Sequence, residues 1–193
     1  MTLDERPTTM TDINLQISRP SSILLIGLGN PILGDDGVGW KIVQEVEAIL
    51  AGDPPAAEQH RTAISKIRQN RQTIEMDYLS LGGLSLMERM LGYGRVILVD
   101  SMETGTQPVG KVSVFALSEL PNPSAGHSAS AHDTSLITAL KTAEAIGAAI
   151  PSMVEVVAVE ALNAYDFKDE LTPEVSKAVP VAVNAVLELL GKI

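Results

Sequence analysis

Apolar runs and helical periods alternate along the chain. The clearest run covers residues 23–28 (ILLIGL), and such a continuous run is typical of a strand buried on both faces of a parallel sheet. Residues 111–117 alternate between apolar and polar side chains, which predicts a strand at or near a sheet edge. In chain order, we predict strands at residues 23–28, 72–76, 95–99, 111–117 and 153–159.

Helical spacing of apolar residues fills the segments between these strands. Val38, Ile42 and Val46 fall near one face of a helix, which predicts an amphipathic helix covering the sheet. In chain order, we predict helices at residues 37–50, 84–91, 135–147 and 172–190. These elements predict a single-domain, three-layer α/β/α sandwich with a mainly parallel, twisted sheet.

Capping residues mark the beginnings of the two later helices. Asp133 and Thr134 are expected to cap the helix at 135–147. Thr172 supplies a capping hydroxyl for the last helix, whose first turn contains Pro173. Pro180 is expected to kink or split that helix because proline lacks the N–H that an interior position requires.

Three segments carry no strong periodicity. Residues 51–71 are polar and locally basic, and we predict a loop there with at most one helical turn. Residues 118–131 are rich in Ser, Pro, Gly and Ala, which predicts a mobile surface loop. Residues 1–20 are expected to form a flexible N-terminal tail, so that residues 21–193 make up the single domain.

Composition narrows the chemistry available to this chain. It contains no Cys, which excludes disulfides, thiolate metal sites and a cysteine nucleophile. The net charge of −10 disfavours nucleic acid and acidic membrane surfaces as partners. Neither an export signal nor a membrane-spanning apolar stretch is found, so we expect a cytoplasmic protein.

Polar residues that follow the predicted strands are the candidates for function. In a parallel sheet, loops at the carboxyl ends of the strands converge on one edge. That rule selects Asp35, Asp36, Asp77 and Asp100, together with His132 before a helix. Carboxylates and an imidazole suit a divalent metal of the first transition row. One of the paired Asp residues could instead cap the following helix, and Asp77 could be a turn residue.

The glycines after the first strand suggest a dinucleotide-binding fingerprint, G-x-G-x-x-G. Gly27 and Gly29 fit that pattern, but Ile32 occupies the position of the third glycine. The carboxylates of Asp35 and Asp36 would also repel a pyrophosphate. We therefore exclude a nicotinamide or flavin dinucleotide site.

Residues 24–39 (LLIGLGNPILGDDGVG) closely resemble the opening of the maturation endopeptidases of nickel–iron hydrogenases, G-x-G-N followed by D-[DE]-G-x-G. Residues 96–100 (VILVD) are similar to that family's third strand and its terminal Asp. Residues 130–133 (SAHD) resemble its S-x-H segment, and residues 171–175 (LTPEV) its last helix. The resemblance spans residues 22–191 in the family's order and implies a peptidase domain of the phosphorylase/hydrolase-like kind.

The resemblance also implies a function and a set of site residues. Such an enzyme removes a C-terminal extension from the hydrogenase large-subunit precursor after nickel insertion. By position, the nickel ligands would be Asp36, Asp100 and His132, and the nickel would be presented by the precursor. Asp35 and Asp77 are candidate bases, although the family's D-x-G-T-x-G around Asp77 lacks its Thr here.

Two other functions are compatible with parts of this pattern. A non-catalytic, nickel-sensing escort of the precursor would use the same three ligands. Residues 27–31 also resemble the start of peptidyl-tRNA hydrolases, but their catalytic His is absent and the net charge disfavours tRNA. We expect a monomeric, metal-dependent endopeptidase whose partner is the nickel-loaded precursor.

Overall fold

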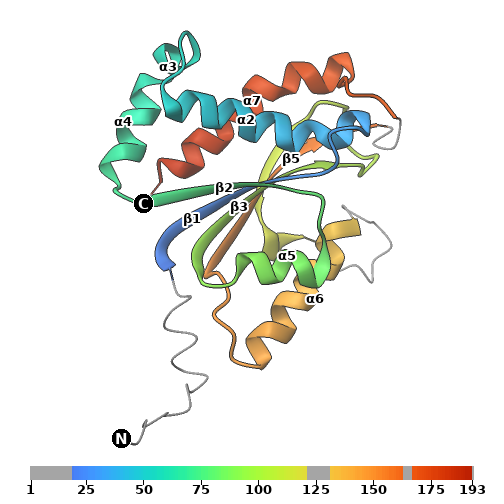
Figure 1. Ribbon diagram of the computed structural model, residues 1–193. Coiled ribbons are helices and arrows are strands. Elements are labelled where there is room, and N and C mark those ends of the chain that lie inside the picture. The colour runs from blue at the N-terminus through green and yellow to red at the C-terminus, as the bar shows by residue number, and fades with distance from the viewer. Residues whose placement is uncertain (1–18, 121–130, 163–166, 193) are drawn as a thin grey trace, which may run out of the picture.

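The computed structural model describes residues 19–120, 131–162 and 167–192, and of residues 19–20 and 131–135 the backbone alone. Within these ranges the strands form one five-stranded sheet in the order β2-β1-β3-β5-β4 (Figure 1). They are β1 (Arg19–Leu28), β2 (Thr73–Leu79), β3 (Tyr93–Met102), β4 (Val112–Ala116) and β5 (Met153–Glu160). All pairs are parallel except β4 with β5, and β4 lies at an edge as predicted.

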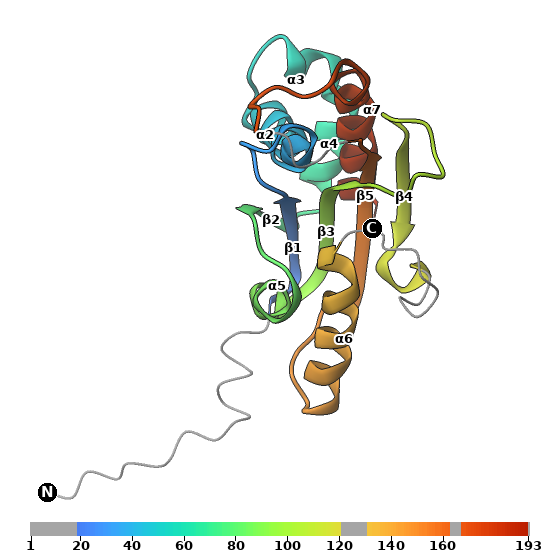
Figure 2. The same ribbon diagram turned by 90° about the vertical axis from the view of Figure 1, so that its right-hand side faces the viewer.

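Helices cover both faces of the sheet, as the two views show (Figures 1 and 2). One face carries α2 (Val38–Ala51), α3 (Ala56–Gln59), α4 (Arg61–Gln69) and α7 (Pro173–Leu190). The other carries α5 (Gly83–Met90) and α6 (Ala131–Ala145). Two short 3-10 helices, η1 (Gly34–Gly37) and η2 (Leu117–Glu119), complete the elements. The predicted three-layer α/β/α architecture is confirmed.

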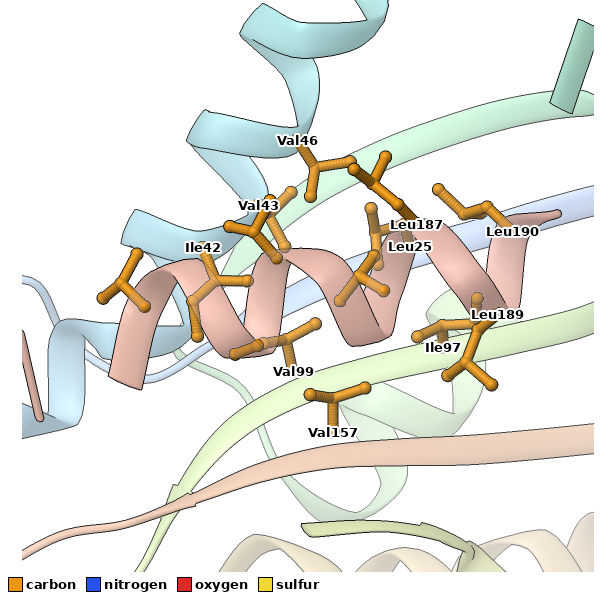
Figure 3. Packing of buried hydrophobic residues seen from close by; sticks show 14 of the residues in the cluster. Leu25, Ile42, Val43, Val46, Ile97, Val99, Val157, Leu187, Leu189 and Leu190 are labelled. Carbon is orange, nitrogen blue, oxygen red and sulfur yellow. The ribbon is translucent and has the colours of Figure 1, made fainter. Parts of the chain in front are cut away.

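The core explains why the central strands are continuously apolar. Successive side chains of a strand point to opposite faces. In β3, Ile97 and Val99 pack with the cluster of α2 and α7, where Figure 3 shows them, whereas Val96 and Leu98 pack with α5 and α6. Because both faces are covered by helices, a polar residue in these strands loses its contact with water.

The prediction of a loop at residues 51–71 is wrong, because this segment folds into α3 and α4. Ile64 and Ile67, three residues apart, are buried in the same core cluster as α7. They are the only large apolar side chains in this nine-residue helix, so the helical period is too weak to detect in a polar and basic sequence.

Other element boundaries also differ from the predictions. The strand predicted to end at Met76 continues to Leu79, and the one predicted to end at Val99 continues to Met102, so that Asp77 and Asp100 lie inside β2 and β3. Helix α6 begins at Ala131, which places Asp133 and Thr134 within the helix instead of at its cap. At the N-terminus, β1 begins at Arg19, and the remainder of the predicted tail, residues 1–18, lies outside the described residues.

Helix α7 is continuous through Pro180, so the predicted split does not occur. Pro180 and Ser176 are both exposed, and water can therefore bind the Ser176 carbonyl that a proline cannot bind. In the segment predicted as a mobile loop, η2 occupies residues 117–119, and residues 121–130 lie outside the described part. Across the described residues, no helix combines the length and apolar character that a membrane span requires.

Candidate active site

Asp36 lies in η1, just beyond the carboxyl end of β1. Its Oδ2 accepts a hydrogen bond from the backbone N–H of Asn30, with a donor–acceptor distance of 2.6 Å. The side chain is half-buried. A short hydrogen bond to a carboxylate is among the stronger kinds in proteins, and this one fixes the direction of the Asp36 side chain.

Two glycines of the motif allow η1 and α2 to approach the sheet closely. Gly29 has a φ of +113°, and a Cβ there would lie 1.8 Å from the backbone oxygen of Asp36. A Cβ on Gly39 would lie 2.3 Å from the carbonyl oxygen of Val99 and 2.4 Å from that of Leu28. The first turn of α2 therefore rests directly on the backbones of β1 and β3, which holds Asp36 over the strand ends.

Asp100 is 2% exposed and lies near the end of β3. By strand alternation it shares the face of Leu98 and Met102, which is covered by α5 and α6. Its Oδ1 accepts a hydrogen bond of 2.9 Å from the backbone N–H of Ser101. The hydroxyl of Ser101 in turn donates to Asp36 Oδ1 at 3.4 Å. Ser101 thus contacts both carboxylates, Asp100 through its backbone N–H and Asp36 through its hydroxyl.

His132 lies in the first turn of α6, but its side chain is outside the described residues. Figure 1 shows that α6 begins on the side toward which the carboxyl ends of the strands point and then runs back beneath the sheet. Among the side chains that the structure describes, no three His, Cys, Asp or Glu residues form a group that could hold a metal ion. The two carboxylates are therefore the described part of the predicted ligand set.

Asp35 is 1% exposed and points away from the solvent edge toward the start of α7. Its Oδ1 accepts the backbone N–H of Thr172 at 2.7 Å, and its Oδ2 accepts the Thr172 hydroxyl at 2.9 Å. The hydroxyl that was predicted to cap α7 therefore makes no cap bond within its own helix. Asp35 ties η1 to α7 instead.

Asp77 forms an ion pair with Arg89 of α5. The same arginine donates to the hydroxyl of Tyr93 at 2.8 Å, and that hydroxyl donates to Glu75 at 2.5 Å. In the parallel register, Asp77 pairs with Ile26 and lies two strands from Asp100, so their Cα atoms are roughly 12 Å apart by strand spacing and rise. The structure therefore does not place Asp77 beside Asp100.

A pocket of about 250 Å³ opens on the face of the sheet that Asp100 shares with Met102, and neighbours of Asp100 line it, although Asp100 itself does not. Its wall includes Ala158, which pairs with Asp100 in the register of β3 and β5, and Met102, two residues beyond Asp100. Phe115 and Lys111 close it from the side of β4. The volume is below the usual 300–1,000 Å³ of small-molecule sites, and it suits a single side chain.

Sequence reasoning missed the residues that hold the carboxylates in place. No sequence rule selects Ser101, although it directly follows Asp100, and Asn30 stands out only as part of the glycine motif. The sequence predicts Thr172 as the cap of its own helix, and no local signal connects it to Asp35, 137 positions earlier. Contacts between residues so far apart along the chain leave no periodicity that a sequence pattern could show.

The five-stranded sheet with helices on both faces and the carboxylates near the strand ends define an α/β protein with a candidate active site at the carboxyl edge of its sheet. The family model HycI, hydrogenase maturation protease, matches residues 66–189. The chain belongs to the hydrogenase maturation protease family.

Individual relatives agree with this membership. A Methanocaldococcus jannaschii protein assigned as a hydrogenase maturation protease is 27% identical over 179 residues, covering 90% of this chain and 99% of the relative. The hydrogenase maturating endopeptidase HybD of E. coli has a similar fold, with a TM-score of 0.59 and 22% identity over 88% of this chain and 91% of that one. HybD of Thermococcus kodakarensis, a [NiFe] hydrogenase maturation protease, gives a TM-score of 0.58 and 22% identity, covering 88% and 99% of the two chains.

Proposed function

We propose that this protease removes the C-terminal extension of a nickel–iron hydrogenase large-subunit precursor after nickel insertion. The observation that carries the proposal is the pair Asp36 and Asp100, joined through Ser101 at the carboxyl edge of the sheet. In this proposal the nickel belongs to the substrate, and the protease recognises it with Asp36, Asp100 and His132.

The donor set fits a nickel ion. Carboxylate and imidazole ligands are both acceptable to divalent metals of the first transition row. Asp36 is half-buried and Asp100 is buried, and a carboxylate that is withdrawn from water attracts a cation more strongly than one on the open surface. Bound nickel would polarise the carbonyl of the nearby peptide bond, so that cleavage depends on correct metal loading.

The remaining candidate residues fit positioning roles. Both carboxylate oxygens of Asp35 accept hydrogen bonds from Thr172, and Asp77 is paired with Arg89. These contacts favour structural anchoring over proton transfer. The pocket lined by Met102 and Ala158 would hold a side chain of the substrate. Cleavage would be a hydrolysis, in which water adds to the carbonyl carbon and the amine leaves.

The test incubates the protein with nickel-loaded and with metal-free precursor and measures the intact mass of the large subunit. Wild type should trim the nickel-loaded form alone. Asp36→Asn, Asp100→Asn and His132→Ala should each lose processing and remain folded by circular dichroism, because Asn keeps the shape of Asp but lacks its charge. Asp53→Asn, an exposed carboxylate at the far end of α2, is the matched control and should process normally.

Three outcomes would contradict the proposal. Efficient trimming of metal-free precursor would show that nickel is not the recognition element. Full activity of Asp100→Asn would remove the residue at the centre of the site. Formation of a complex with the nickel-loaded precursor without any change in its mass would identify an escort instead of an enzyme acting on this substrate.

A further inference from the structure

Exposed apolar side chains are concentrated at the edge of the sheet that carries Asp36 and Asp100. Among the described residues, nine large hydrophobic side chains are exposed, and five of these follow the carboxyl ends of strands. These five, called here the apolar rim, are Ile32, Leu81, Leu84, Leu162 and Phe167. The other four are scattered over β4, β5, α7 and the end of α6.

Backbone contacts attach the rim to the loop that holds Asp36. Ile32 belongs to that loop, and its N–H donates to the Asn30 side chain at 3.2 Å. The hydroxyl of Ser80, next to Leu81, donates to the Gly29 carbonyl at 2.7 Å. The N–H of Gly34 donates to the carbonyl of Lys168, next to Phe167, at 2.6 Å. Ile32 and the neighbours of Leu81 and Phe167 are therefore attached to the loop that holds Asp36.

The exposure of these side chains has no explanation in the fold. Ile32 is 55% exposed and Phe167 is 83% exposed, and neither belongs to a core cluster. Single exposed apolar residues are ordinary, but a group gathered around one site is typical of a surface that binds another protein.

Resting on the proposed function, we propose that the apolar rim docks the nickel-loaded large-subunit precursor. The negative charge near the rim favours this partner over a second copy of the chain. Ile32 lies in the loop that carries the half-buried Asp36, and the exposed Asp169 and Glu170 follow Phe167. Two copies meeting through the rim would bring like charges face to face, each chain carrying −10. A precursor that presents a cation within an apolar surface complements both Asp36 and the rim.

The experiment compares Ile32→Ser, Leu81→Ser and Phe167→Ser with Ile146→Ser. Ile146 is the matched control because it is 73% exposed and lies beyond the end of α6, away from the strand ends. Each rim variant should raise KM for nickel-loaded precursor by about fivefold or more, as truncation of an interface anchor does, and leave kcat close to wild type. The control should leave both constants unchanged.

Binding is also measured as a Kd for immobilised nickel-loaded precursor, with Asp36, Asp100 and His132 unchanged in every variant, at low temperature and within contact times over which intact mass shows no trimming. Rim variants should weaken binding relative to Ile146→Ser. Equal Kd values for rim and control variants, or no binding by the control, would overturn the docking proposal. Failure of wild type to trim the precursor would instead overturn the proposed function, and the comparison of Kd values would still test the rim as a docking surface.

Self-association of wild type that the rim variants abolish would show that a second copy of the chain occupies the rim, and it would overturn the proposal.

Discussion

Ser101 is the residue that couples the two carboxylates of the site. Its backbone N–H donates to Asp100, and its hydroxyl donates to Asp36 from the opposite face of the strand. A single residue can serve both because β3 continues past Asp100 to Met102, so that Ser101 still has strand geometry. Only the second of these bonds depends on the identity of the side chain.

Substitution of Ser101 by Ala should therefore weaken the site without dismantling it. The Asp100 contact would remain, and Asp36 would lose one of its two hydrogen bonds. Loss of a group that orients a metal-binding side chain typically costs about 10–100-fold in activity, and we expect a fall in processing rate within that range. The measurement is the rate of precursor trimming by intact mass.

Ser152→Ala is the matched control for this change. The Ser152 hydroxyl donates to the Gly94 carbonyl at 2.7 Å, at the opposite end of the sheet. It should lower neither the processing rate nor the thermal midpoint appreciably. An unaltered rate in the Ser101 variant would show that the Asp36 carboxylate needs no support from β3.

At the scale of elements, η1 is held from two sides. The motif glycines place it against β1 and α2, and Asp35 connects it to Thr172 at the start of α7. The N–H of Gly34 also donates to the carbonyl of Lys168, just before α7. Segments that are about 135 residues apart in sequence therefore fix the same short helix.

This anchoring gives a test that separates positioning from proton transfer by Asp35. Thr172→Val removes one of the two hydrogen bonds and leaves the Asp35 carboxylate intact. If Asp35 is an anchor, Thr172→Val and Asp35→Asn should both lower the free energy of unfolding. The expected loss is about 1.5–3 kcal/mol, the contribution of a hydrogen bond to a charged group. Both variants should also slow processing. The measurements are chemical denaturation and trimming rate.

Thr142→Val provides the comparison, because the Thr142 hydroxyl bonds only to the carbonyl of Thr138 on the exposed face of α6. It should change neither quantity appreciably. Complete loss of processing in Asp35→Asn combined with near-normal processing in Thr172→Val would identify Asp35 as a base and contradict the anchoring role.

The whole molecule is acidic and asymmetric. Its apolar rim lies at the edge of the sheet that carries the loop of Asp36, while the outer faces of the helices are largely polar. A net charge of −10 on a 20.5 kDa chain opposes self-association through that edge. We therefore expect the protein to be a monomer whose apolar rim stays exposed until the substrate binds.

Light scattering coupled to size exclusion checks the monomer directly. A mass near 20.5 kDa is expected over a range of protein concentrations and at low salt, where repulsion between like charges is strongest. High salt screens that repulsion and provides the more demanding condition. A dimer at low salt would contradict the expectation, and its loss in Phe167→Ser would locate the interface at the rim.

Sequence alone determined the class of fold and the family. The apolar runs at residues 23–28 and 95–99 predicted buried parallel strands because a strand covered on both faces has no polar side. The glycine spacing around Asp36 identified the motif because the backbones there lie in van der Waals contact, which leaves no room for any side chain at those positions. Both constraints act on residues that are close together along the chain, so the sequence shows them directly.

Tertiary structure decided what surrounds those residues. It placed Ser101 between Asp36 and Asp100, directed Asp35 to Thr172, and separated Asp77 from the site through its pairing with Arg89. It also folded residues 61–69 into α4, whose stability comes from packing of Ile64 and Ile67 in the core shared with α7. These outcomes depend on contacts between distant segments, whose energies are set by geometry that no local pattern encodes. The roles of Asp36, Asp100 and His132 as nickel ligands stay a prediction of the motif.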